Sequence, residues 1–129
     1  MLWNQRLTTK QYLFLAISWT IIILIIVGIP GNQIPRVSKF IDLFQPDKIV
    51  HLVMFAPFSW LWATYIYGVS NSRKRSVYFV MIFGILYAIL SELLQLYVFI
   101  GRNANVPDAI ADIVGVIVGI TIFIKNTNK

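Results

Sequence analysis

The stretch VYFVMIFGILYAILSELLQLYVFI, residues 77–100, contains Glu92 as its one charged side chain. An α-helix rises about 1.5 Å per residue, so this stretch is long enough to cross the roughly 30 Å hydrocarbon layer of a membrane. Three further stretches share this character, in a chain of 129 residues that is 58% hydrophobic and only 12% charged. Such a composition excludes an intrinsically disordered chain and a large soluble catalytic domain. The four predicted membrane spans are residues 12–29, 49–67, 77–100 and 107–124.

The apolar runs lack the alternation of a membrane-spanning strand, so helices are the structure that satisfies their backbone in lipid. The sequence therefore predicts an all-α fold, an integral membrane bundle of four transmembrane helices in a single domain over residues 1–129. The first run also has the position of a signal peptide. Because it is longer than a typical signal region and lacks a small-x-small cleavage site, we expect it to be retained. The chain has no cysteine, which excludes a disulfide, a thiol nucleophile and a cysteine-type zinc site.

Lysine and arginine lie mainly in three of the segments that flank the spans, namely the two tails and the second loop. In a chain that crosses the membrane four times, the two tails and the second loop lie on the same side. Because cytoplasmic segments are enriched in these residues, we expect both termini in the cytoplasm. The basic residues flank apolar runs, so the net charge of +6 indicates membrane lipids as partners and not nucleic acid. The basic residues of the three segments are Arg6, Lys10, Arg73, Lys74, Arg75, Lys125 and Lys129.

The first outer loop contains a short amphipathic segment, RVSKFIDLF, residues 36–44. Its apolar residues Val37, Phe40, Ile41 and Phe44 recur at helical spacing. This spacing fits a short helix lying in the outer membrane interface. An irregular loop packed on the bundle fits it equally well, and the sequence favours neither.

Ionisable side chains inside the spans are confined to the half that we expect to face outward. A charged residue at the centre of a membrane helix costs about 2.5–3.5 kcal/mol on insertion scales, so its position is informative. At about 1.5 Å per residue, Glu92 lies roughly 12 Å below the outer end of its helix and Asp112 roughly 8 Å below its own. The residues predicted to meet in one outward-facing patch are Asp47, Lys48, His51, Glu92, Gln95, Arg102, Asp108 and Asp112.

The fourth span carries a stripe of two carboxylates above two glycines, at i, i+4, i+7 and i+11 spacing. The glycines form a G-x-x-x-G contact surface, which also suits a contact between copies of the chain in an oligomer. We expect this stripe to pack face to face with a stripe of small residues on the third span. The stripe on the fourth span is Asp108, Asp112, Gly115 and Gly119, and that on the third is Gly84, Ala88, Ser91 and Gln95.

Structural explanations compete with functional ones for several of these residues. Asp47 and His51 are four apart, which suits a hydrogen bond that fixes the imidazole tautomer. Asp47 equally suits the cap of the second helix. Glu92 and Asp112 suit a purely structural ion pair with Arg102, since buried charges persist when they are paired.

Three stretches in this order resemble the VanZ-like family: DKIVHLVMF (47–55), YAILSELLQ (87–95) and RNANVPDAIADIVGVIVG (102–119). The founding member of that family is associated with resistance to lipoglycopeptide antibiotics of the teicoplanin type. The resemblance implies a small multi-pass protein of the bacterial cytoplasmic (inner) membrane with a role in the cell envelope. The residues that fit the family pattern are Asp47, Lys48, His51, Glu92, Gln95, Arg102, Asp108, Gly115 and Gly119.

The chain departs from this family pattern at three positions. Leu52 stands where phenylalanine is frequent, and Ala88 replaces a glycine. Asp112 replaces a common asparagine, which adds a carboxyl group inside the membrane. Inside the membrane, this carboxyl group must be protonated, pair with Arg102 or bind a cation.

Three functions stay open on the sequence. The first is an outward polar pocket that binds a lipid or lipoglycopeptide-like amphiphile, with teicoplanin-type resistance or another envelope role. The second is an intramembrane enzyme acting on a lipid or cell-wall precursor, with His51, Glu92 and Asp108 as candidate catalytic residues. The third is a purely structural polar cluster. A channel is disfavoured, because the polar residues stop halfway across the membrane.

The sequence predicts no cofactor and no metal ion. One histidine with carboxylates is a poor ligand set for a transition metal. An oxygen-rich Mg²⁺ or Ca²⁺ site stays open, since these ions take carboxylate ligands.

Overall fold

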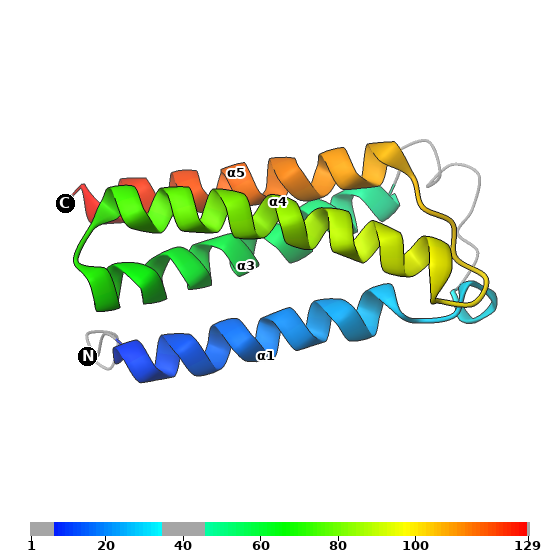
Figure 1. Ribbon diagram of the computed structural model, residues 1–129, viewed down its shortest axis with the longest axis horizontal. Helices are drawn as coiled ribbons and strands as arrows, with labels where there is room; N and C mark the ends of the chain where they lie inside the picture. The colour runs from blue at the N-terminus through cyan, green and yellow to red at the C-terminus, as the bar shows by residue number, and fades with distance from the viewer. Residues whose placement is uncertain (1–6, 35–45, 129) are drawn as a thin grey trace.

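Four long helices form a bundle in the computed structural model (Figure 1). The structure describes residues 7–34 and 46–128. All four helices are long and apolar enough to cross a membrane, which confirms the predicted all-α bundle of membrane-spanning helices. The helices are α1 (Thr9–Val27), α3 (Pro46–Ser70), α4 (Arg73–Tyr97) and α5 (Val106–Thr127), and a 3₁₀ turn, η1 (Gly31–Gln33), follows α1.

The helix ends differ from the predicted spans by a few residues, because capping side chains determine where a helix begins. α1 begins at Thr9 after a capping box, in which the Thr8 hydroxyl accepts from the N–H of Gln11 (3.3 Å) and the Gln11 side chain accepts from that of Thr8 (2.7 Å). α4 begins after Ser72, whose hydroxyl caps the first turn. The amphipathic segment expected at residues 36–44 lies outside the described residues.

Aromatic side chains fill the middle of the bundle. Phe58 and Tyr87 stack with ring centroids 5.0 Å apart, and Phe55 lies 5.7 Å from each of them. The Tyr87 hydroxyl donates to the carbonyl oxygen of Thr20 (2.6 Å), and the Trp62 indole N–H donates to the hydroxyl of the same threonine (3.0 Å). These bonds satisfy buried polar groups and hold α1 against α3 and α4.

Two glycines set how closely α5 approaches α3. A Cβ at Gly115 would lie 2.7 Å from the carbonyl oxygen of Leu52. One at Gly119 would overlap the carbonyl oxygen of Ala56 and the hydroxyl of Ser59. Only a residue without a side chain permits this spacing. The prediction that this stripe packs against the third predicted span, α4, is therefore wrong for its two glycines, which face α3, whereas Asp112 of the stripe does contact Ser91 of α4.

α4 contacts a different side of α5. A Cβ at Gly84 would lie 2.7 Å from Cγ2 of Val116, so this glycine receives the valine side chain. α5 therefore packs between α3 and α4. Because Gly115 and Gly119 are both used inside the chain, an oligomer built through them stays a prediction without support from this packing.

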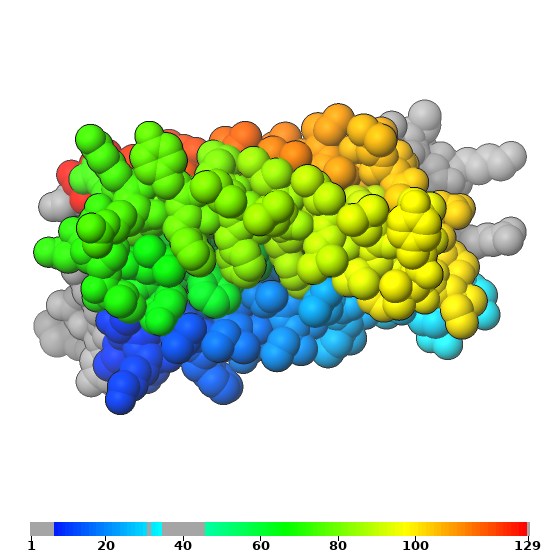
Figure 2. Space-filling model, viewed as in Figure 1, coloured from blue at the N-terminus to red at the C-terminus, as the bar shows by residue number. Residues whose placement is uncertain are grey.

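Large apolar side chains cover the outside of the bundle. Phe14 is 71% exposed, Ile82 61% and Ile117 47%, and similar residues lie on all four helices. Figure 2 shows one such face, formed mostly by side chains of α1 and α4. Apolar surface of this extent is unfavourable in water but matches the acyl chains of a bilayer. The protein is therefore a multi-pass membrane protein.

The two ends of the bundle differ in character (Figure 1). The start of α1, the α3–α4 turn and the end of α5 lie together, where Arg73 donates to the side chain of Asn128 and Gly68 packs against Thr9. We call this the basic end, because Lys10, Arg73, Lys74, Arg75 and Lys125 lie there. The opposite end carries η1, the start of α3 and the α4–α5 connection, and we call it the polar end.

Candidate functional site

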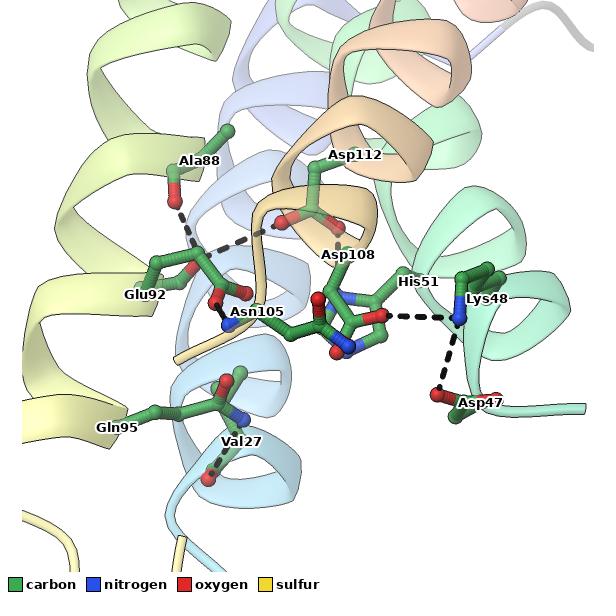
Figure 3. Close-up of polar contacts among 11 residues, drawn as sticks. Val27, Asp47, Lys48, His51, Ala88, Glu92, Gln95, Asn105, Asp108 and Asp112 are labelled. Atoms are coloured by element: carbon green, nitrogen blue, oxygen red, sulfur yellow. Dashed lines mark hydrogen bonds and ion pairs between the residues drawn. The ribbon is translucent and has the colours of Figure 1, made fainter. Parts of the chain in front are cut away.

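A histidine and an aspartate join α3 and α5 toward the polar end (Figure 3). His51 Nδ1 and Asp112 Oδ1 are 2.8 Å apart, and the residues are 5% and 0% exposed. The other carboxylate oxygen of Asp112 lies 3.4 Å from the Ser91 hydroxyl on α4. Asp112 thus receives polar contacts from both neighbouring helices. The close contact of Gly115 with Leu52, the residue after His51, brings α3 and α5 together at this point.

The predicted bond between Asp47 and His51 is wrong. The Nδ1 atom of His51 contacts Asp112 instead, while the Asp47 side chain is 56% exposed and lies 3.7 Å from Lys48 Nζ. The histidine is buried, so it pairs with an inward-facing carboxylate and not with one that water can solvate. Asp47 keeps its place in the first turn of α3, where a carboxylate interacts favourably with the helix dipole.

Lys48 reaches from α3 to α5 across the polar end. Its Nζ atom lies 3.8 Å from Asp108 Oδ1. Asp108 is only 8% exposed, and this oxygen has no hydrogen-bond partner within the described residues. At this distance the ammonium group balances charge without making a hydrogen bond. The Asp108 carboxylate therefore keeps an unfilled acceptor.

Glu92 of α4 forms a hydrogen bond with the α4–α5 connection next to the site. Its Oε2 atom accepts from the backbone N–H of Asn105 at 2.8 Å, and the residue is 7% exposed. Asn105 is the residue that precedes the first turn of α5. It is not among the predicted site residues, because a backbone N–H leaves no signal in the pattern of side chains. Among residues 7–34 and 46–128, Glu92 makes no ion pair.

The guanidinium group of Arg102 lies beside the side-chain amide of Gln95 and not beside a carboxylate. Figure 3 draws the Gln95 amide nitrogen facing the carbonyl oxygen of Val27 at 3.5 Å. A half-turn of the amide places its oxygen 2.6 Å from Nη2 and 3.3 Å from Nε of Arg102, which satisfies both groups. The structural ion pair of Arg102 with Glu92 or Asp112 does not occur in the part of the chain that the structure describes. A neutral amide holds the guanidinium instead.

Three of the predicted site residues direct donor atoms toward one another from three helices. One ring nitrogen of His51 and one carboxylate oxygen each of Glu92 and Asp112 lie within 4.8 Å of one another, and all three residues are buried. This set suits proton transfer through the imidazole, or a cation held by nitrogen and oxygen donors. We call the following residues the polar cluster: Lys48, His51, Glu92, Asp108 and Asp112.

An open groove of about 220 Å³ lies between α4 and the start of α5. Glu92 belongs both to this groove and to the polar cluster, while most of the lining is apolar. Ile89 and Leu93 are each 47% exposed, so the groove opens toward the lipid. A hydrocarbon chain fits such a surface beside a carboxylate. The lining residues are Ile89, Glu92, Leu93, Ala104, Asn105, Val106 and Ala109.

Comparison with known proteins identifies the family. A family model described as VanZ/LLP1 matches residues 4–126, which is nearly the whole chain and includes the polar cluster. No curated protein and no solved structure matches the chain. The family match confirms the resemblance seen in the three sequence stretches. The chain belongs to the VanZ/LLP1 family.

Proposed function

We propose that this protein binds the headgroup of a lipid-like or lipoglycopeptide-like amphiphile in its polar cluster. The observation that carries the proposal is a buried, charged cluster directly beside an apolar groove. Charged residues inside a membrane are costly and mark ligand sites or ion pathways. A ligand with a charged head and a hydrocarbon tail matches both surfaces at once.

Glu92 is the residue that connects the two surfaces. Its carboxylate faces the polar cluster, and the same residue lines the groove with Ile89 and Leu93. Lys48 and Arg102 add positive charge at the polar end, which suits an anionic or zwitterionic headgroup. The tail of the ligand then lies in the groove, among apolar side chains.

The proposed site faces outward from the bacterial cytoplasmic membrane. The basic end contains Arg73, Lys74 and Arg75, and positively charged short loops remain in the cytoplasm. Both termini are then cytoplasmic, and the polar end lies in the outer leaflet. A ligand reaches this site laterally, from the lipid of that leaflet or from the cell envelope.

Protection against a teicoplanin-type antibiotic tests the proposal. We expect the wild-type protein to raise the inhibitory concentration in a susceptible Gram-positive host. Glu92→Gln and Arg102→Ala are expected to lower it to the empty-vector level while accumulating normally in the membrane. Lys125→Ala is the matched control, because it removes a positive charge at the basic end and should leave protection intact.

Native mass spectrometry of the detergent-extracted protein gives a second measurement. We expect the wild type, but not Glu92→Gln, to retain an amphiphile. Protection or retention by Glu92→Gln and Arg102→Ala at wild-type levels would contradict the proposal. An absence of both protection and retention in the wild type would also contradict it.

An intramembrane enzyme is the second candidate function, and the His51–Asp112 pair is the observation that favours it. A carboxylate on Nδ1 fixes the imidazole tautomer and leaves Nε2 to give or take a proton. A carboxylate oxygen of Glu92 lies within 4.8 Å of a ring nitrogen of His51, a distance that one bridging water molecule can span. Product formation from envelope lipids that depends on His51 would favour catalysis over binding.

A further inference from the structure

We propose that His51, Glu92 and Asp112 bind a divalent cation in the polar cluster. Their three donor atoms lie within 4.8 Å of one another, on side chains from α3, α4 and α5. Two ligands of one ion lie at most twice the metal–ligand distance apart, which is about 4–5 Å for bonds of about 2.0–2.6 Å. The three atoms are therefore close enough to surround one ion after small side-chain rotations.

The charge balance of the cluster supports a cation. Glu92 is 7% exposed, and its polar contact among the described residues is the backbone N–H of Asn105 at 2.8 Å. The ammonium group of Lys48 lies at Asp108 instead, 3.8 Å from its carboxylate. A buried carboxylate without a cationic partner is unfavourable in a membrane. A protonated His51 can balance only one of the two carboxylates, whereas a divalent cation bound with His51 as a neutral ligand balances both Glu92 and Asp112.

A second observation comes from Asp108, one helical turn before Asp112. Figure 3 shows its carboxylate beside His51. The Oδ1 atom of this carboxylate is buried without a hydrogen-bond partner in the described part of the chain. This oxygen faces Lys48 Nζ at 3.8 Å, and a buried acceptor that no described donor fills indicates a water molecule or an ion bound in the polar cluster.

The donor set favours some cations over others. The sequence favoured Mg²⁺ or Ca²⁺ over a transition metal, but the structure places an imidazole nitrogen beside the two carboxylates. This mixed set suits Mn²⁺ or Zn²⁺ better than Mg²⁺ and Ca²⁺, which prefer oxygen ligands alone. We therefore expect Mn²⁺ and Zn²⁺ to bind more tightly than Mg²⁺ or Ca²⁺. This order of affinities follows from the position of the imidazole next to both carboxylates. The spacing of these residues in the sequence does not show that position.

The cation also narrows the class of ligand, and this step rests on the proposed function. Three protein ligands leave coordination positions open on a divalent ion. An ion with open positions attracts anionic oxygen atoms of a ligand. The amphiphile is then one with an oxyanion headgroup, such as a phosphate.

Titration with Mn²⁺ tests the site on the full-length, detergent-purified protein after chelator treatment and removal of any affinity tag. Electron paramagnetic resonance measures the free ion, and we expect one Mn²⁺ per chain, displaced by Zn²⁺. Glu92→Gln and Asp112→Asn are expected to weaken binding by about tenfold or more. Asp47→Asn is the matched control, because its side chain is 56% exposed and lies outside the three ligands.

A second readout uses the wild-type protein and does not depend on how the variants fold. His51 is the only histidine of the chain, so pulsed electron paramagnetic resonance should show nitrogen coupling from one imidazole to the bound Mn²⁺. Absence of Mn²⁺ binding, or bound Mn²⁺ without nitrogen coupling, would overturn the cation site. Either result leaves the protection assay unaffected, whereas lost protection with retained Mn²⁺ would overturn the proposed function alone.

Discussion

Asp112 makes polar contacts with both helices that pack against α5. It is 0% exposed, it lies 2.8 Å from His51 Nδ1, and it also contacts the hydroxyl of Ser91. Asparagine has the same shape and one acceptor oxygen, so it can keep the bond to a protonated Nδ1. Alanine has no acceptor and would leave the His51 nitrogen buried and unpaired.

This difference gives a prediction for two substitutions at one position. We expect Asp112→Asn to unfold at nearly the wild-type temperature, whereas Asp112→Ala lowers the free energy of unfolding by about 1–3 kcal/mol. Thermal unfolding in detergent measures both. Asp47→Ala serves as the control, since substitution of an exposed residue changes stability by about 0.5 kcal/mol or less. An unchanged melting temperature for Asp112→Ala would show that the buried pair contributes nothing to the fold.

At the scale of the elements, α5 has two different packing surfaces. Gly115 and Gly119 bring its backbone against α3, where the neighbouring atoms include backbone carbonyl oxygens. On its other side, the side chain of Val116 fits against Gly84 of α4. A backbone atom can move only if the whole helix moves, whereas a side chain can adjust locally. The α3–α5 contact is therefore the less tolerant of the two.

Alanine substitutions at these glycines test the α3–α5 contact. Replacing glycine by alanine inside a helix is normally stabilising, by about 1 kcal/mol. We expect the opposite sign at Gly119, with a loss of about 1–3 kcal/mol or more, because the new methyl group overlaps the Ala56 carbonyl oxygen. Gly84→Ala should cost less, since Val116 can shift. A Gly119→Ala protein that melts above the wild type would contradict the described helix spacing.

At the scale of the whole molecule, the bundle is asymmetric along the membrane normal. The buried charged residues lie toward the polar end, and the basic α3–α4 turn lies at the other end with the start of α1 and the end of α5. Lipid insertion penalises charge in the middle of a span, while positive loops stay in the cytoplasm. These two effects are the reason why we expect the proposed site to lie in the outer leaflet.

Cysteine labelling tests this orientation cleanly, because the natural chain has no cysteine. Gln33→Cys and Asn103→Cys lie in exposed connections at the polar end, and we expect an impermeant thiol reagent to label both in intact cells. Asn126→Cys lies at the basic end and should react only after the membrane is permeabilised. Labelling of positions 33 and 103 from opposite sides would exclude a site formed by both connections.

Composition and span length by themselves determined the membrane class, the four spans and the half of the bundle in which polar residues gather. Composition and span length suffice for this because the free energy of placing a charged side chain in lipid depends on the residue and its depth. It does not depend on which helices pack together. The family was suggested by the resemblance of three sequence stretches, 47–55, 87–95 and 102–119, and the match over residues 4–126 confirms it. The functional roles of the predicted site residues stay predictions.

The pairing of residues was decided only by the tertiary structure. Periodicity shows which residues share a helix face, and it grouped Asp112 correctly with Gly115 and Gly119. It does not show which neighbouring helix that face meets. The rotation of α5 depends on packing against α3 and α4 together, so its glycines face α3 and its aspartate pairs with His51. Such contacts between distant segments arise from the joint packing of three helices, which no single helix encodes.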